Sequence, residues 1–214
     1  MSRTTIARAV VDEAGRTLAQ EAGIRLEDKP SPLWRLLVLA NLVSARISAD
    51  IAIAAARELT GAGATTPDGM LGLTWQQRVD ALGRAHYVRY DESTATRLGE
   101  CAERLRDHHG GDLRRLADEA GGDPRRLERD LQGFKGIGPT GAAIFCREAQ
   151  QVWEWLRPYF DGVSRKGAER VGLPTAESEL AGLVDGGELA SFAAGLARVA
   201  RDAGLAERVR RTAG

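Results

Sequence analysis

Two stretches of the chain carry residue types that could bind a phosphate and act on the molecule attached to it. Residues 133–142 read Gly-Phe-Lys-Gly-Ile-Gly-Pro-Thr-Gly-Ala, and Asp161 follows within Tyr-Phe-Asp-Gly-Val-Ser-Arg. Gly136 and Gly138 can take positive φ and let a ligand approach the main chain closely. The N–H groups of such a turn attract an anion. A carboxylate a short distance downstream is then placed to do chemistry on what the phosphate carries.

Helical segments on both sides must position this turn. Leu127, Leu131 and Phe134 recur at a helical spacing over residues 124–134. The dipeptide Asp123-Pro124 supplies a helix cap followed by a first-position proline. Pro139 opens the second helix in the same way, because its missing N–H costs nothing there. The sequence therefore predicts a hairpin of two helices around the turn. A tight helix connection that binds nothing is the alternative.

Composition favours helices over the rest of the chain as well. Alanine, leucine, arginine and glutamate dominate, and no alternating strand with a hairpin turn is found. We therefore predict an all-α fold. The other expected helices cover residues 2–22, 33–46, 49–59, 74–82, 93–108, 112–120, 175–184 and 188–205, and residues 61–72, rich in Gly, Thr and Pro, are predicted to be a loop.

The hairpin and the aspartate together resemble the helix-hairpin-helix (HhH-GPD) DNA glycosylase superfamily that includes endonuclease III. Residues 134–142 match the family pattern Leu-Pro-Gly-Val-Gly-x-Lys-Thr-Ala, and Asp161 matches the aspartate of its Val-Asp-Thr-His motif. Residues 31–46 resemble the family's early core helix, and residues 82–87 its Ile-Gly-x-Tyr loop. The resemblance implies a single unit over residues 1–214. Within this unit we expect two closely packed helical subdomains with a cleft between them. The first covers residues 33–122, and the second covers residues 1–32 plus 123–214.

The resemblance implies a catalytic role for Asp161. Breaking an N-glycosidic bond builds positive charge on the deoxyribose, and a nearby carboxylate stabilises that state and orients or deprotonates the attacking water. Thr140 stands where the bifunctional members keep a Schiff-base lysine, so AP lyase activity is not expected. Lys135 lies before the turn and takes no such role from the resemblance. A displaced nucleophile at Lys135 or Lys166 stays open.

The same resemblance assigns contacts with DNA. Arg46 matches the polar residue that enters the duplex beside the extruded base, and His86 and Tyr87 occupy the loop that carries a wedge. Arg165 and Lys166 follow the aspartate closely and either contact phosphates or lie solvated. No metal held by side chains is expected, and a monovalent cation at the hairpin carbonyls stays open. The expected hairpin contacts are Gly136, Ile137, Gly138, Thr140 and Gly141.

Three aromatic residues, Trp153, Trp155 and Tyr159, cluster between the hairpin and Asp161. They could form the wall of a pocket that stacks on an extruded base. Ordinary packing in the protein core is the alternative.

Charge and cysteine content limit the partners and cofactors. The 214 residues hold 30 Lys+Arg and 30 Asp+Glu, so the net charge is zero. This balance argues against a large electrostatic footprint on nucleic acid, although a local patch is compatible with it. Cys101 and Cys146 lack metal-ligand spacing, so neither an iron–sulfur cluster nor another cofactor is expected. No signal peptide or membrane-spanning run is visible, and we expect a cytoplasmic monomer, associated with the nucleoid in a bacterium.

Three functions remain open. The first is base-excision repair of double-stranded DNA by a monofunctional glycosylase, with oxidised pyrimidine, alkylated purine, uracil and mismatched bases all possible as substrates. The second is a non-catalytic helix-hairpin-helix DNA-binding protein in which Asp161 is a structural cap. The third is a helical protein–protein adaptor, which rests on the net neutrality and predicts no salt-dependent affinity for DNA.

Overall fold

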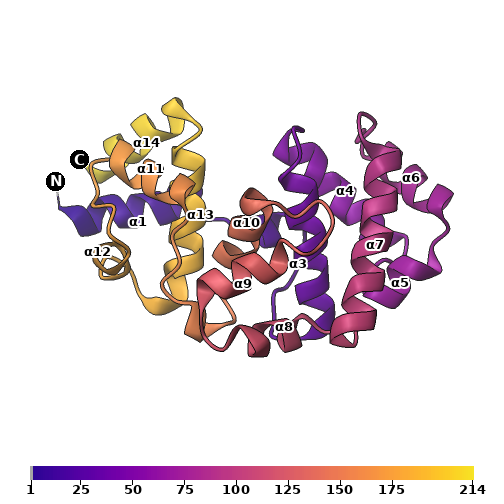
Figure 1. Ribbon diagram of the computed structural model, residues 1–214. Coiled ribbons are helices and arrows are strands. Elements are labelled where there is room, and N and C mark those ends of the chain that lie inside the picture. The colour runs from indigo at the N-terminus through magenta and orange to yellow at the C-terminus, as the bar shows by residue number, and fades with distance from the viewer. Residues whose placement is uncertain (1) are drawn as a thin grey trace. The chain divides into compact units, whose positions relative to one another are not determined.

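The protein is helical throughout the computed structural model, which describes residues 2–214 (Figure 1). No strand forms within this range, so the predicted all-α fold is confirmed. Every helix of the same range is too short or too polar to span a bilayer. The helices gather into two compact units. The terminal unit combines the chain up to Leu18 with Cys146–Gly214, and the middle unit is Ala19–Phe145.

The middle unit is built around one apolar helix, α3 (Pro30–Val43). Nearly every residue from Leu33 to Leu42 is buried, which is typical of a helix covered on several sides. It packs against α4 (Ala49–Gly61) and α8 (Leu113–Ala120), while α5 (Pro67–Gly72) and α6 (Trp75–Arg84) pack against α7 (Asp91–His109). The unit also contains α9 (Pro124–Leu131). The chain enters it through α2 (Leu18–Glu21) and leaves through α10 (Pro139–Ala149).

The terminal unit is centred on α13 (Leu189–Val199). This helix packs against α1 (Arg3–Ala14), α11 (Gly162–Arg170) and α14 (Ala203–Ala213), so helices from both ends of the chain lie together (Figure 1). A Cβ at Gly167 would lie 1.9 Å from the Leu196 carbonyl oxygen, so glycine is what permits the close approach of α11 and α13. Phe160 and Phe192 meet edge to face in the core. The short elements are the 3-10 helices η1 (Glu154–Leu156) and η2 (Gly186–Glu188) and the helix α12 (Glu177–Ala181).

Three predicted elements are wrong, and two predicted helix starts are confirmed. The single helix over residues 188–205 ends at Val199, and Asp202 caps the separate helix α14. The single helix over residues 2–22 breaks into α1 and α2, because Gly15, a poor helix former, takes the C-cap of α1. Residues 61–72 are not wholly a loop, because Thr66 caps and Pro67 opens α5. A threonine cap followed by proline is a common helix start. The prediction missed it because it relied on the high glycine content of the segment. Thr74 opens α6 with a capping box, and Asp123 caps α9.

The two units divide the chain at different positions from the predicted subdomains 33–122 and 1–32 plus 123–214. Residues 19–32 and 123–145 both belong to the middle unit. Arg35 of α3 donates to the Gly23 carbonyl at 3.2 Å, which ties the first of these segments to α3. Asn41 of the same helix donates to the Lys135 carbonyl at 2.9 Å, which ties the second. These polar contacts between distant residues carry no signal in the local composition.

Candidate functional site

The hairpin lies between α9 and α10 in the middle unit. The Ile137 N–H donates to the Phe134 carbonyl at 3.0 Å, which closes the turn. Gly136 has a φ of +81°, a conformation that favours glycine. A Cβ at this position would also lie 3.0 Å from Nδ2 of Asn41, so both the dihedral angle and the space select glycine. Gly138 is not at positive φ, and a Cβ there would meet open space, so this position requires glycine less strictly than position 136.

Helices α3 and α7 hold the hairpin through a single carbonyl group. Nδ2 of Asn41 donates to the Lys135 oxygen at 2.9 Å, and Sγ of Cys101 donates to the same oxygen at 3.1 Å. Burial raises the pKa of the Cys101 thiol to about 12, so the thiol stays protonated and can donate. The Lys135 side chain is exposed. The loop is therefore fixed to the protein by its backbone while its lysine faces solvent.

The predicted hairpin contacts divide by exposure. Gly136, Gly138 and Thr140 are exposed around the start of α10, so their backbone can meet a ligand. Ile137 and Gly141 are buried, and a Cβ at Gly141 would lie 3.4 Å from the Ile137 side chain. These two residues therefore anchor the hairpin rather than present it. The monovalent cation at the hairpin carbonyls stays a prediction.

Three further predicted DNA contacts belong to the middle unit. Arg46 is exposed just beyond the end of α3. His86 is exposed in the α6–α7 connection with a φ of +60°, an uncommon conformation for a residue with a side chain. Tyr87 requires a correction. Its side chain is fully buried, and burial raises the pKa of its phenol, so the ring packs inside the protein instead of facing DNA.

The exposed apolar residue of this loop is Val88, which the motif comparison missed. It is 64% exposed, next to Arg89, whose guanidinium carbon lies 5.2 Å from the centre of the Tyr90 ring. The sequence signal was an apolar residue directly after the matched motif, in a short connection between two helices. Val88 rather than Tyr87 therefore presents an apolar side chain at this place.

Asp161 begins α11 in the terminal unit. Its Oδ1 accepts the Ser164 N–H at 2.7 Å, the bond typical of an N-cap residue. Its Oδ2 accepts from Nη1 of Arg147 at 2.6 Å. The whole residue is 8% exposed, and the side chains of Arg147 and Asp161 are 4% and 6% exposed. Both carboxylate oxygens are therefore engaged, and the negative charge lies against a buried guanidinium.

Arg147 is the functional candidate that sequence reasoning missed. It lies on α10, 14 residues before Asp161, in a stretch where both its apolar and its polar neighbours are buried. The signal was two charged residues, Arg147 and Glu148, inside the otherwise apolar run from Ala142 to Ala149. An arginine in such a run is rarely buried unless it is paired, so a search for its carboxylate partner would have been justified.

Gln150 fixes the segment that leads from α10 to the aspartate. Its Nε2 donates to the Tyr159 carbonyl at 2.9 Å, and its Oε1 accepts the Tyr159 N–H at 3.0 Å. Arg157 donates to the carbonyls of Gln150 and Gln151, each at 2.7 Å. Because Tyr159 stands two positions before Asp161, these bonds bring the start of α11 back to the end of α10. The ion pair with Arg147 follows from this arrangement.

The three aromatic residues predicted to line a base pocket differ in exposure. Trp153 and Tyr159 are buried, as the core-packing alternative requires, while Trp155 is 38% exposed. The rings of Trp153 and Trp155 stack, with centroids 5.9 Å apart and planes at 21°. Of the three, Trp155 is the one exposed enough to stack on a ligand, and its ring is stacked on that of Trp153.

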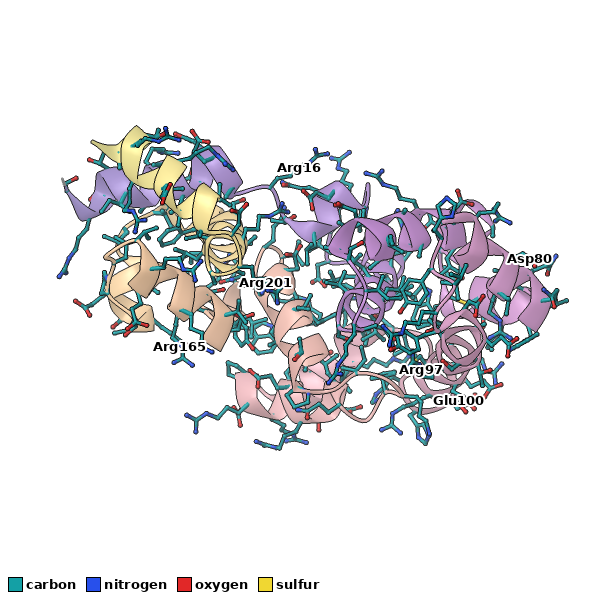
Figure 2. The ribbon with its side chains drawn as sticks, turned by 90° about the horizontal axis from the view of Figure 1, so that it is seen from above. Arg16, Asp80, Arg97, Glu100, Arg165 and Arg201 are labelled. Atoms are coloured by element: carbon teal, nitrogen blue, oxygen red, sulfur yellow. The ribbon has the colours of Figure 1, made fainter. Side chains whose placement is uncertain are left out.

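Arg165 and Lys166 are exposed in the first half of α11, four and five residues after the Asp161 cap. Figure 2 shows Arg165 extending from its helix. Exposed cations at these positions fit both predicted alternatives, contact with a flanking phosphate and simple solvation.

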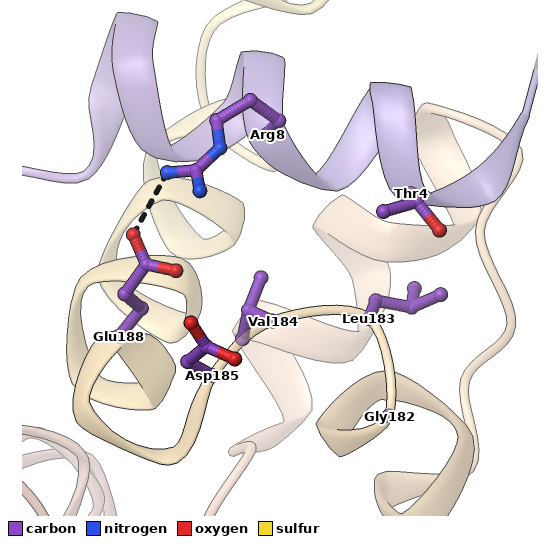
Figure 3. Close-up of a pocket in the computed structure, with 7 residues that line it drawn as sticks. All are labelled: Thr4, Arg8, Gly182, Leu183, Val184, Asp185 and Glu188. Carbon is purple, nitrogen blue, oxygen red and sulfur yellow. Dashed lines mark hydrogen bonds and ion pairs between the residues drawn. The ribbon is translucent and has the colours of Figure 1, made fainter.

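A separate cavity of about 310 Å³ lies in the terminal unit (Figure 3). Arg8 of α1 and Glu188 of η2 form an ion pair at its edge, with 2.8 Å between nitrogen and oxygen. None of the predicted site residues lines it; its lining is Thr4, Arg8, Gly182, Leu183, Val184, Asp185 and Glu188. Across residues 2–214, no group of three or more His, Cys, Asp and Glu residues is arranged to hold a metal ion.

Comparison with known proteins finds similarity to solved structures only. No protein-family model and no curated protein matches the chain. A solved structure of a non-covalent endonuclease III–DNA complex is similar, with a TM-score of 0.52 and 14% identity over 92% of this chain and 85% of that chain. A trapped endonuclease III–DNA covalent intermediate, an estranged-adenine complex, gives 0.49 and 16% over the same shares. The similarity to the non-covalent complex shows that the chain has an endonuclease III-like helix-hairpin-helix fold, as its sequence predicted.

Proposed function

We propose that this protein is a base-excision DNA repair glycosylase that uses Asp161 to hydrolyse the N-glycosidic bond of a damaged or mismatched base. The fold it shares with endonuclease III, which was solved in complex with DNA, supports the proposal. The exposed glycine turn at the start of α10 supports a contact with the phosphate backbone. The observation that carries the proposal is the carboxylate of Asp161, which two fixed donors orient.

The bonded carboxylate retains the capacity for this chemistry. An ionised carboxylate offers about four acceptor positions, and the Arg147 and Ser164 bonds use one on each oxygen. The remaining positions can accept a water molecule and deprotonate it as it attacks the sugar. The negative charge can stabilise the positive charge that develops on the deoxyribose. The guanidinium of Arg147 opposes that second effect, so orientation of the water would be the larger contribution of Asp161.

We expect hydrolysis without strand cleavage. A lyase step needs an amine that forms a Schiff base with the sugar, and Thr140 supplies a hydroxyl at the matching position. Lys135 and Lys166 are exposed amines that stay open as weak substitutes. The residues also do not fit an iron–sulfur cluster, since the two cysteines, Cys101 and Cys146, are buried and a cluster takes four ligands. We propose action without a cofactor, as a cytoplasmic monomer.

One observation favours a second candidate, a non-catalytic DNA-binding protein of the same fold. Asp161 already performs two structural tasks, since it caps α11 and neutralises the buried Arg147. These two structural tasks account for an aspartate at this position without any catalytic role. The hairpin of such a protein would still bind DNA. The two candidates differ in base release and agree in DNA binding.

A panel of duplexes, each with one lesion, tests both candidates. It contains an oxidised pyrimidine, an alkylated purine, uracil and a mismatch, and an undamaged duplex is the control. A monofunctional glycosylase produces strand breaks only after alkali treatment of the product, whereas a lyase produces them without it. Binding to every duplex without base release supports the second candidate. Absence of salt-dependent DNA affinity contradicts both and supports the adaptor function.

A further inference from the structure

Two arginines of α7 lie on the side of the helix that touches the hairpin. Arg97, Cys101 and Arg104 are spaced by four and three residues, so they share one side of the helix. Cys101 marks this side as the hairpin contact, because its Sγ donates to the Lys135 carbonyl. Arg97 Cδ would lie 3.2 Å from a Cβ at Gly136, and Arg104 Nη2 would lie 2.7 Å from a Cβ at Gly133. The loop 133–136 therefore has an arginine beside each end.

Neither arginine is neutralised by a carboxylate in the described part of the chain. Arg97 donates to the Thr94 hydroxyl at 2.7 Å, and the guanidinium carbon of Arg104 lies 5.6 Å from the centre of the Phe134 ring. The Nε atoms of both arginines are buried and have no acceptor. The protein thus orients these guanidinium groups with a hydroxyl and a ring, and both leave the positive charge in place.

The local charge at the hairpin is positive although the chain is neutral. Lys135 adds an exposed cation to Arg97 and Arg104. Glu100, which comes from the same helix as Arg97 (Figure 2), is the carboxylate whose charge acts on Cys101. Arg97, Arg104 and Lys135 therefore place three cations at this loop. Many other arginines of the chain are paired, as Arg84 is with Glu58 and Arg114 with Asp112.

We propose that Arg97 and Arg104 each bind a backbone phosphate of duplex DNA and so extend the hairpin site onto α7. A guanidinium offers several N–H donors in a plane that matches phosphate oxygens, and its charge is permanent. The two arginines flank the glycine turn, so they would bind phosphates on either side of the one that meets the hairpin backbone. This inference rests on the proposed DNA-binding function and names the side chains that supply the affinity.

The salt dependence of binding tests the inference without knowledge of the lesion. The full chain is titrated with a labelled, undamaged duplex at several salt concentrations, as wild type and as Arg97→Gln and Arg104→Gln. Each phosphate contact contributes about 0.9 to the slope of log K against log salt. Each substitution should therefore reduce the slope by about 1 and weaken binding about eightfold at roughly 0.1 M salt. Arg106→Gln is the matched control, because residue 106 lies nearly opposite residue 97 on α7.

Charge-retaining variants separate recognition from folding. Arg97→Lys and Arg104→Lys should keep the wild-type slope, since the slope counts neutralised phosphates. If the glutamine variants bind with the same slope as Arg106→Gln while wild type binds normally, the inference is wrong and the proposed function stands. If the lysine variants lose slope as the glutamine variants do, the arginines act through the fold, which also overturns the inference. If wild type shows no salt-dependent binding, the proposed function fails together with it.

Discussion

The buried ion pair between Arg147 and Asp161 should stabilise the folded protein. The substitution Asp161→Asn measures how much stability the pair contributes. The pair is formed at 2.6 Å between side chains that are 4% and 6% exposed. Asparagine keeps an oxygen that can accept the Ser164 N–H, so the cap of α11 survives. The charge that balances Arg147 is lost. The substitution therefore isolates the ion pair from the cap.

Removing one partner of a buried pair leaves the other charge without compensation, which costs about 3–5 kcal/mol. In a chain of this length, 1 kcal/mol corresponds to a change of roughly 2–4 °C in Tm. We therefore expect Asp161→Asn to lower Tm by roughly 6–20 °C. The double variant Arg147→Met/Asp161→Asn should recover much of this loss, because it removes both charges from the interior.

Thermal unfolding followed by circular dichroism measures these changes at fixed pH and salt. Glu179→Gln is the control, because it removes a carboxylate of the same unit whose pair with Arg3 is more than half exposed on both sides. Exposed pairs contribute about 0–1 kcal/mol, so this control should melt close to wild type. If Asp161→Asn melts together with the control, the buried pair is not formed in solution. Asp161 would then be a free carboxylate, and its structural role would be refuted.

Two smaller predictions concern the hairpin and its supports. Gly136→Ala should destabilise the protein by about 1–2 kcal/mol, because φ is positive at this position and Asn41 fills the space; urea unfolding checks this, and Gly138→Ala, which meets open space, should be nearly neutral. Cys101 should resist thiol reagents at about pH 8 in the folded protein, since its pKa is raised to about 12 and the protonated thiol is not nucleophilic; rapid labelling without denaturant would contradict this.

Local sequence signals predicted the features that are fixed by neighbouring residues. The apolar run of α3 is buried as expected, because a helix that is apolar on every side has to be covered. Asp123 and Thr74 cap helices as their types and positions indicate. Gly136 takes the positive φ that only a glycine turn accommodates readily. In each case the physical cause lies within a few residues of the position itself.

The features that were missed depend on residues far apart in the chain. Arg147 and Asp161 meet because Gln150 pairs with the Tyr159 backbone and folds the chain back, which no periodicity reveals. Tyr87 matches a loop motif, yet its ring is buried by packing that the motif does not encode. For the same reason, the sequence placed a carboxylate at the start of a helix but could not show that both of its oxygens are occupied.

Single-turnover base release from the lesion duplexes, by wild type and by Asp161→Asn, tests the proposed chemistry most directly. It should be run at a temperature where thermal unfolding shows both proteins to be folded. We predict that wild type releases at least one lesion base and leaves an alkali-sensitive site, and that Asp161→Asn binds the same duplex with unchanged affinity and releases none. Equal release by both proteins, or tight binding by wild type without release of any base, would contradict the role of Asp161 as the catalytic residue.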